Sequence, residues 1–411
     1  MKKIFNKSSN LYKKIYSQSP GGVLAIRRPY NFVPENYPIF FKRGKGSKVY
    51  DIDNNKFIDM TCGYGPIILG YQNKLLDNKV INQIKNNGNC FTLTQPVQYK
   101  LVSLLNNIFK TDKAIIVKTG SDAASLSIRL ARSFTGKQKV IRCGYHGWHD
   151  WCVGDKYGIP KNIQKDVIEL KYNDLSHLKY LIKENSGKIA CLIIWPVHTP
   201  LGERVQFPSK EYLNEIKDIC NKNEIILIFD EIRSGFRMSL SGAQSFYKIR
   251  PDLTIVGKAM ANGYPISAVL GKREIMDQAL HKVYVSSTFF GNSIDQVAAL
   301  ETIKIINKNN ILKKNMIKGK LIKNNIEKLL KKFKFKAHFS GDFWFPFITF
   351  EEENFEINRK IKNLFYSSLI DKGIFLAPHH HGYIMDRHSN KDIEDFLNSV
   401  EYAFNKVNKV Y

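Results

Sequence analysis

The sequence predicts an α/β fold, with a mostly parallel sheet flanked by helices and a smaller α+β domain after it. The first observation is that short runs of β-branched residues alternate with amphipathic stretches from about residue 114 onward. This alternation is typical of strands that helices bury on both faces. The second is composition, because 43% hydrophobic and 12% aromatic residues supply large cores, while 24% charged residues excludes a disordered chain. The third is length, since 411 residues exceed one usual core.

The predicted elements follow this pattern along the chain. In the α/β region, strands are expected at residues 114–117, 139–142, 189–195, 225–229 and 253–256, and the clearest helices at 122–134 and 209–223. The segment 311–336 is Lys-rich with apolar residues at roughly helical spacing, which predicts a helix with one solvated basic face. Strands at 344–350 and 374–377 and helices at 354–371 and 391–406 complete the chain. We therefore predict an N-terminal segment (1–65), a large α/β domain (66–308) and a C-terminal α+β domain (309–411).

The chain is strongly basic, with 63 Lys and Arg against 37 Asp and Glu and a formal net charge of +26. Such a charge raises nucleic acid, anionic membranes and acidic small molecules as partners. A companion excess of Asn and Ile indicates a compositional bias that also raises Lys, so we expect no nucleic acid and no membrane partner. No apolar run approaches the roughly 20 residues of a membrane helix, and no apolar core follows the basic N-terminus. The six cysteines form no Cys-x-x-Cys pair, so a reducing, cytoplasmic location is expected.

A turn between a predicted strand and a predicted helix carries three small or polar residues, Gly120, Ser121 and Asp122. Backbone amides and the positive end of the helix dipole converge at a helix N-terminus, and glycine lets the backbone approach an oxyanion closely. The turn therefore suits a phosphate group. Taken alone, it is also consistent with an ordinary helix N-cap.

Two carboxylates, Asp230 and Glu231, follow a hydrophobic strand that is expected to be buried. Ligands of open α/β sheets bind at the carboxyl ends of strands, so a carboxylate here is expected to face a cation. Neighbouring Arg233 and Arg237 disfavour a divalent metal ion. The alternative is a pair of solvated acids at the start of a loop.

Lys258 follows the apolar strand at 253–256 and precedes a loop of small residues. Desolvation lowers the pKa of an amine and frees its lone pair, which makes a lysine nucleophilic toward an aldehyde. A lysine whose ammonium group reaches solvent is the common alternative. The chain order of phosphate turn, strand-end acid and loop lysine indicates pyridoxal 5′-phosphate, held by its phosphate, its ring nitrogen and its aldehyde.

These residues resemble those of the class III aminotransferases, and within that family the glutamate-1-semialdehyde 2,1-aminomutase branch. The resemblance covers most of the chain and includes the three constellations and the segments 20–23, 49–59 and 144–149. The combination of these motifs at their spacing is specific, whereas the strand before Lys258 or the strand before Asp230, taken alone, is only moderate evidence. The resemblance implies fold type I of the pyridoxal phosphate enzymes.

The resemblance also implies the role of each site residue. Lys258, Asp230 and Tyr145 are the expected catalytic residues: Lys258 binds the cofactor aldehyde and moves the proton at the substrate carbon, and Asp230 faces the ring nitrogen. The other expected cofactor contacts are Tyr145 and Ile232 on the two ring faces, His146 on the cofactor side, Gly120, Ser121 and Asp122 at the phosphate, and Thr288 at the phosphate of a neighbouring subunit. A homodimer is therefore expected.

Three residues are expected to bind substrate. Arg28 aligns with an arginine that the aminomutases use for a substrate carboxylate, although its neighbour Arg27 blurs the register. Tyr64 is expected to line the same pocket. His381 stands at about the position of a glutamate that handles the substrate amine in the aminomutases, which argues against aminomutase activity.

Two further departures from the family pattern concern the cofactor pocket. Asp122 stands where the family usually has Glu, and this shorter acid should keep the helix cap. Trp195-Pro196 stands where Glu-Pro is usual, which should change the pocket without preventing cofactor binding.

The histidines offer a metal site as an alternative, because they cluster at 379–381 and 388 and because His146 and His149 lie three residues apart. Adjacent histidines on an extended segment point to alternate faces, so they rarely converge on one ion. We expect them to line a pocket and expect no metal.

The expected function is an aminotransferase that moves an amino group from an amino donor to a small aldehyde or ketone. The basic composition favours an anionic acceptor, such as a phosphorylated or sugar-linked one. An aminomutase, which keeps the amino group within one substrate molecule, is the nearer alternative, and decarboxylase and racemase chemistry stays open. The alternative of a different class is a basic nucleic-acid or membrane-binding protein on an enzyme scaffold, which would use the face of segment 311–336.

Overall fold

The computed structural model describes residues 3–23, 29, 32–33, 36–153, 157–333 and 335–410. The chain divides into two compact units. The first unit comprises Met1–Asn73, Leu201–Val205 and Lys313–Tyr411, and the second comprises Lys74–Pro200 and Gln206–Leu312. The three-part division expected from the sequence stays a prediction.

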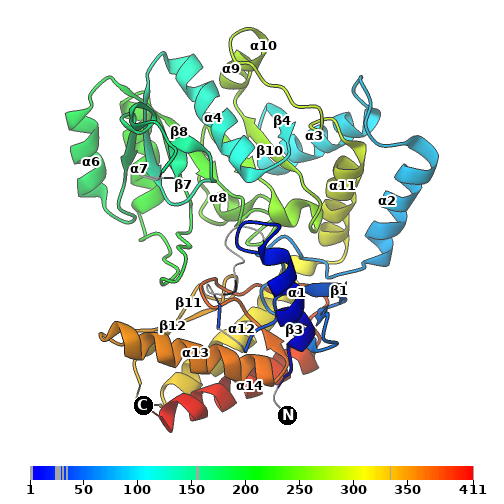
Figure 1. Cartoon of the computed structure of the whole chain (residues 1–411). Helices are drawn as coiled ribbons and strands as arrows, with labels where there is room; N and C mark the ends of the chain where they lie inside the picture. Colours follow the sequence, from blue (N-terminus) through cyan, green and yellow to red (C-terminus); the bar gives the residue numbers. More distant parts are fainter. Residues whose placement is uncertain are drawn as a thin grey trace. The chain divides into compact units, whose positions relative to one another are not determined.

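A seven-stranded sheet forms the centre of the second unit, with the order β4-β10-β9-β8-β7-β5-β6 (Figure 1). All neighbouring strands from β9 to β6 run parallel, and β10 runs antiparallel to both β4 and β9. The strands are β4 (Lys113–Val117), β5 (Lys139–Cys143), β6 (Val167–Glu169), β7 (Ile189–Ile194), β8 (Ile226–Asp230), β9 (Leu253–Val256) and β10 (Ser267–Gly271).

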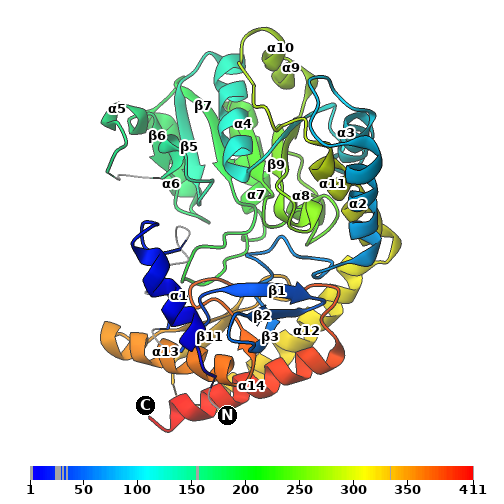
Figure 2. The ribbon, with the colours of Figure 1, turned by 45° about the vertical axis from the view of Figure 1, so that its right-hand side comes forward.

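Helices cover both faces of this sheet (Figure 2). Alternate side chains of a strand point to opposite faces, and β8 shows this, since Ile226 and Ile228 pack with α4 while Leu227 and Phe229 pack with α6 and α7. The helices of the second unit are α2 (Lys74–Asn87), α3 (Pro96–Phe109), α4 (Gly120–Thr135), α5 (Lys161–Gln164), α6 (Leu175–Glu184), α7 (Tyr212–Lys222), α8 (Gly242–Phe246), α9 (Arg273–Met276), α10 (Gln278–His281), α11 (Ser293–Lys308) and the 3-10 turns η3 (Asp150–Cys152) and η4 (Lys258–Ala261).

The first unit combines small sheets with long helices. One sheet has the order β1-β2-β3-β13, and β11 and β12 form a separate antiparallel pair. An aromatic core that includes Phe57, Phe350, Phe365 and Phe404 lies beneath them. The elements are β1 (Phe41–Lys45), β2 (Lys48–Asp51), β3 (Lys56–Asp59), β11 (Ala337–Ser340), β12 (Phe347–Phe350), β13 (Ile374–Phe375), α1 (Asn6–Tyr16), α12 (Ile311–Leu330, most of it in this unit), α13 (Phe355–Asp371) and α14 (Asn390–Asn408).

The predicted α/β fold is confirmed, because the five strands expected in the α/β region form β4, β5, β7, β8 and β9. Several expected elements are shorter than predicted: the helix expected at 209–223 spans Tyr212–Lys222, and the strand expected at 374–377 spans Ile374–Phe375. Helix α12 ends at Leu330 instead of residue 336, since Phe333 and Phe335 contact Phe404 edge-on, with ring centroids 5.4 and 5.3 Å from that of Phe404. The strand expected from residue 344 begins at Phe347, since a turn precedes it in which the Phe345 amide donates to the Gly341 carbonyl at 3.0 Å.

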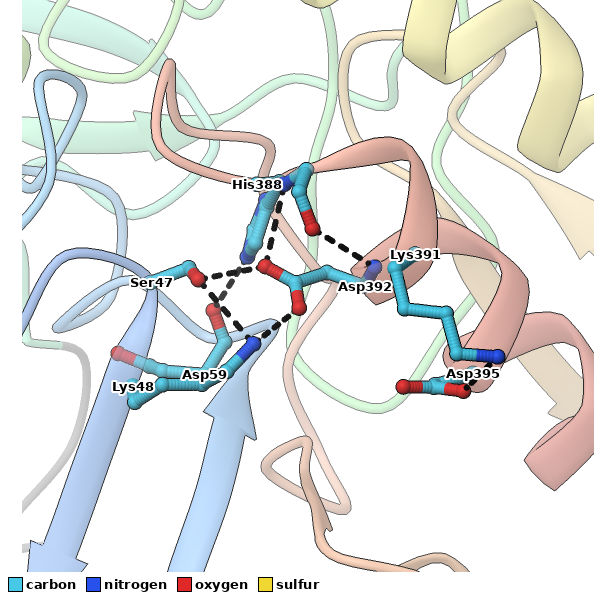
Figure 3. A network of polar contacts seen from close by, with 8 residues as sticks. Ser47, Lys48, Asp59, His388, Lys391, Asp392 and Asp395 are labelled. Carbon is cyan, nitrogen blue, oxygen red and sulfur yellow. Dashed lines mark hydrogen bonds and ion pairs between the residues drawn. The ribbon is translucent and has the colours of Figure 1, made fainter.

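A buried polar network joins the β2–β3 hairpin to the start of α14 within the first unit (Figure 3). Ser47 donates its hydroxyl to Asp392 Oδ2 at 2.6 Å, and Lys48 forms an ion pair with the same carboxylate. His388 accepts the Met385 amide on Nδ1 at 3.2 Å and donates from Nε2 to the Asp59 carbonyl at 3.0 Å. Burial lowers the pKa of His388 to about 4, so this imidazole is neutral near pH 7.

None of the described helices is both long and apolar enough to cross a lipid bilayer.

Candidate active site

The turn before α4 is built as a helix cap that also presents small residues. Thr119 is the N-cap: its hydroxyl accepts the Asp122 amide at 3.1 Å, and the Asp122 carboxylate accepts the Thr119 amide at 2.8 Å. This capping box uses the Asp122 side chain, so the ordinary N-cap interpretation holds for that residue. Gly120 and the buried Ser121 are the first two residues of the helix. The side chains at the positive end of the helix dipole are therefore small.

The loop after β5 closes over this turn. Gly147 has φ +125°, and a Cβ there would lie 2.4 Å from Ser121 Oγ, so only glycine fits. The Trp148 amide donates to the same hydroxyl at 3.2 Å. Tyr145 and His146 belong to this loop, which packs against the turn before α4 through Gly147 and Trp148.

Asp230 ends β8 and is held by three donors. Its Oδ2 accepts His146 Nδ1 at 2.8 Å and the Trp195 indole N–H at 3.1 Å, while Oδ1 accepts the Ile232 amide at 3.0 Å. Asp230, His146 and Trp195 are each at most 4% exposed. The other ring nitrogen, His146 Nε2, is buried without a hydrogen-bond partner among the residues the structure describes.

Glu231, the second acid of the pair, has a structural role. Its carboxylate accepts the amides of Ala243 at 2.9 Å and Gln244 at 2.7 Å at the start of α8, and it also accepts the Ser234 hydroxyl. Burial raises the pKa of Glu231 to about 7, although these hydrogen bonds act in the opposite direction. The two neighbouring carboxylates therefore serve different purposes, and neither is a solvated loop acid.

Lys258 follows β9 in an unusual backbone conformation. Its φ is +44°, in the left-handed region, which costs a non-glycine residue about 1 kcal/mol or more. Burial lowers the pKa of its amine to about 7; Arg233 and Arg237 lower it further, and Asp230 acts in the opposite direction. A strained backbone and an amine with a depressed pKa are features of a reactive residue.

The other predicted cofactor contacts also lie in the second unit. Ile232 is close to both the phosphate turn and the lysine strand, because a Cβ on Gly120 or Gly257 would lie 3.3 or 3.1 Å from its Cδ1. Tyr145 is half exposed. Thr288 is exposed on the loop before α11, and its carbonyl lies 3.6 Å from Cys90 Sγ. The roles assigned to these residues stay predictions.

Two of the predicted substrate residues, Tyr64 and His381, belong to the first unit. Tyr64 lies in a run of four left-handed residues, 62–65, and its ring contacts His380 edge-on with centroids 5.0 Å apart. His381 is fully buried, and its Nε2 lies 2.7 Å from the Tyr383 hydroxyl. Arg28 lies outside the described residues. Among the residues that the structure covers, no group of three or more His, Cys, Asp or Glu side chains is placed to hold a metal ion.

Two side chains of the site could not be assigned from the sequence. Trp195 was expected only to change the pocket, whereas it donates directly to Asp230. The sequence indicates for Arg233 only that it disfavours a metal ion. In the structure its guanidinium lies 4.4 Å from the centre of the Trp195 ring. The guanidinium also donates to the Thr199 carbonyl, and to the Thr199 hydroxyl at 2.6 Å. The available signal was position, because Trp195 follows β7 and Arg233 follows its neighbour β8.

A mostly parallel sheet with a small-residue turn before α4, a buried carboxylate at the end of β8 and a lysine of depressed pKa after β9 is characteristic of a pyridoxal phosphate enzyme of fold type I. The sequence matches the family described as aminotransferase class-III over residues 31–385, and the chain belongs to this family. It is 45% identical to a 3-aminobutyryl-CoA aminotransferase of Cloacimonas acidaminovorans, over 98% of each chain. It is 32% identical to a glutamate-1-semialdehyde 2,1-aminomutase of Methanosphaera stadtmanae, over 98% of this chain and 99% of that one.

Solved structures agree with this assignment. The FumI protein of Sphingopyxis sp. MTA144, solved in its pyridoxal phosphate internal aldimine form, superposes with a TM-score of 0.92 at 26% identity, over 98% of this chain and 96% of that one. A glutamate-1-semialdehyde aminomutase variant of Pseudomonas aeruginosa superposes with a TM-score of 0.87 at 16% identity, over 98% of this chain and 95% of that one, and so shows the fold alone. The predicted aminotransferase family and fold type are thus confirmed.

Proposed function

We propose that this enzyme exchanges an amino group between a 3-amino acyl thioester of coenzyme A and a small keto acid, with pyridoxal 5′-phosphate as its cofactor. The observation that carries the proposal is the 45% identity to a 3-aminobutyryl-CoA aminotransferase over nearly the full length of both chains. A coenzyme A thioester is a phosphorylated anion, so it also suits a chain of net charge +26.

The described residues fit the cofactor. Gly120 and Ser121 at the start of α4 would hold its phosphate. Asp230 would accept the ring N–H, because a carboxylate has about four acceptor positions and three are used here. Lys258 would bind the aldehyde, since a pKa of about 7 leaves much of its amine neutral at physiological pH.

When bound, pyridoxal phosphate withdraws electrons from the substrate carbon that carries the amino group. Lys258 Nζ would accept the proton from that carbon and deliver it to the aldehyde carbon of the cofactor, as amino transfer requires, because its pKa of about 7 is close to the working pH. The Asp230 carboxylate would keep the ring nitrogen protonated, since two unit charges about 4 Å apart gain roughly 4 kcal/mol at an effective dielectric of 20.

Further residues would orient the ring and exclude water. Tyr145 and Ile232 would cover its two faces, and His146 would fix the Asp230 carboxylate through the 2.8 Å hydrogen bond. Asp122 would act through the capping box. Thr288 would reach the phosphate site of a second subunit, which makes the working enzyme a homodimer. Tyr64, His381 and Arg28 are proposed to contact the substrate.

The test is a product analysis with purified, cofactor-loaded enzyme. We expect (R)- or (S)-3-aminobutyryl-CoA and pyruvate to yield alanine and the corresponding 3-oxoacyl thioester, whereas free 3-aminobutyrate reacts much more slowly. Reaction of the free acid at the same rate would remove the thioester from the proposal. Rearrangement of glutamate-1-semialdehyde without any added acceptor would instead identify an aminomutase.

A further inference from the structure

We propose that Trp195 is a positioning residue for the cofactor: its indole N–H holds the Asp230 carboxylate in the orientation that receives the ring nitrogen. This inference rests on the proposed cofactor site. Trp195 follows β7 and Asp230 ends the adjacent parallel strand β8, so the two side chains meet at the carboxyl ends of these strands. The hydrogen bond between them measures 3.1 Å, and both residues are 4% exposed.

The donors around Asp230 determine where a ligand can bind. His146 Nδ1 and Trp195 Nε1 occupy both acceptor positions of Oδ2, and the Ile232 amide occupies one position of Oδ1. The remaining position lies on Oδ1. Without the indole donor, Oδ2 would have a single partner, and the carboxylate could turn about its Cβ–Cγ bond. The free acceptor position on Oδ1 would then no longer point in a fixed direction. Binding of the ring nitrogen would have to order the carboxylate first, and this ordering costs free energy.

Trp195 is itself held on several sides. Gly144, in the loop after β5, has φ +115°, and a Cβ there would lie 2.8 Å from the indole. Only glycine at position 144 therefore leaves enough space for the Trp195 ring. The Arg233 guanidinium lies 4.4 Å from the ring and is anchored on the buried Thr199. The rings of His146 and His198 lie at 5.7 and 5.6 Å. These contacts fix the direction of the N–H before any ligand arrives.

The indole is a donor that carries no charge and does not titrate in the working range. It therefore orients Asp230 without neutralising it, whereas a cationic donor would compete with the ring nitrogen for the same negative charge. His146 is the other side-chain donor, and its buried Nε2 lacks a partner among the described residues. Trp195 thus donates to Asp230 through a side chain that has no titratable group.

The decisive experiment replaces the N–H and keeps the ring. 3-Benzothienylalanine has the bicyclic shape of tryptophan with sulfur in place of N–H, so its incorporation at position 195 preserves the packing. We expect the dissociation constant of pyridoxal phosphate, measured by absorbance titration of the apoenzyme, to rise about tenfold, since a hydrogen bond to a charged group is lost. Trp195→Phe should weaken binding at least as much. Trp151→Phe is the matched control, because it removes an indole hydrogen bond to Ser125, 2.9 Å long, elsewhere in the same unit.

A double-mutant cycle shows whether Trp195 acts through Asp230. In the Asp230→Asn background, Trp195→Phe should change the dissociation constant by less than about twofold, because the group that it orients is gone. Equal binding by the benzothienylalanine and native proteins would overturn the inference and leave Trp195 a packing residue, and so would equal effects of Trp195→Phe in both backgrounds. Failure of the native apoenzyme to bind pyridoxal phosphate would instead overturn the proposed function.

Discussion

Acidification should destabilise the first unit through His388, the buried histidine of the β2–β3 to α14 network. The pKa of this imidazole is about 4 in the folded protein because of its burial, against about 6.5 in an unfolded chain. A histidine with a lowered pKa stabilises the fold fully above pH 6.5, and this stability is lost as the pH falls toward 4. The full loss is about 3 kcal/mol, of which about 2 kcal/mol is lost between pH 7.5 and pH 5.

The assay is urea unfolding of the native protein and of His388→Gln at pH 7.5 and pH 5, followed by circular dichroism. Glutamine does not titrate, so the variant should start less stable and then lose about 2 kcal/mol less than the native protein on acidification. Comparing the two proteins is necessary because Glu231, with a pKa raised to about 7, and His198, with a pKa lowered to about 4, titrate in the same range. His281→Gln replaces an exposed histidine and should lose as much as the native protein. Equal losses for His388→Gln and the native protein would refute the reasoning.

Three further predictions concern the cofactor site. Gly147→Ala should weaken pyridoxal phosphate binding at least about tenfold, because the added Cβ would lie 2.4 Å from Ser121 Oγ. Gly136→Ala is the control, because Gly136 also has positive φ but a Cβ there would have no atom within 4 Å. Equal effects of the two variants in a cofactor titration would contradict this prediction. Arg233→Gln should raise the pKa of the Lys258 amine, because it removes a neighbouring cation, so covalent trapping of the aldehyde by apoenzyme should require a higher pH than in the native protein. Asp230→Asn should lower kcat by at least about 100-fold, because roughly 4 kcal/mol of charge stabilisation is lost, and a steady-state assay with unchanged kcat would exclude the assigned role.

Much of the second unit was predictable because its signals are local. The runs that form β7, β8 and β9 are hydrophobic on both faces, and Asp230 ends β8 while Lys258 follows β9 after Gly257. The antiparallel strand β10, Ser267–Gly271, was not predicted, since its small residues lack the length and the β-branched content of its neighbours.

The interactions between strands could not be read from the sequence. Asp230 and Glu231 are adjacent and chemically alike, and only the packing of Trp195 from β7 and of the α8 amides separates their roles. Likewise, the sequence places three histidines together at 379–381, but only the fold buries His380 and His381 while leaving His379 exposed. Contacts of this kind depend on which elements become neighbours, a property that no local pattern encodes.

The central claim is that the Lys258 amine forms the covalent link to pyridoxal phosphate. Borohydride reduction of the cofactor-saturated protein, followed by proteolysis and mass spectrometry, should find a pyridoxyl group on the peptide that contains Lys258, and Lys258→Ala should abolish it. A pyridoxyl group on another lysine, or on none, would contradict the account.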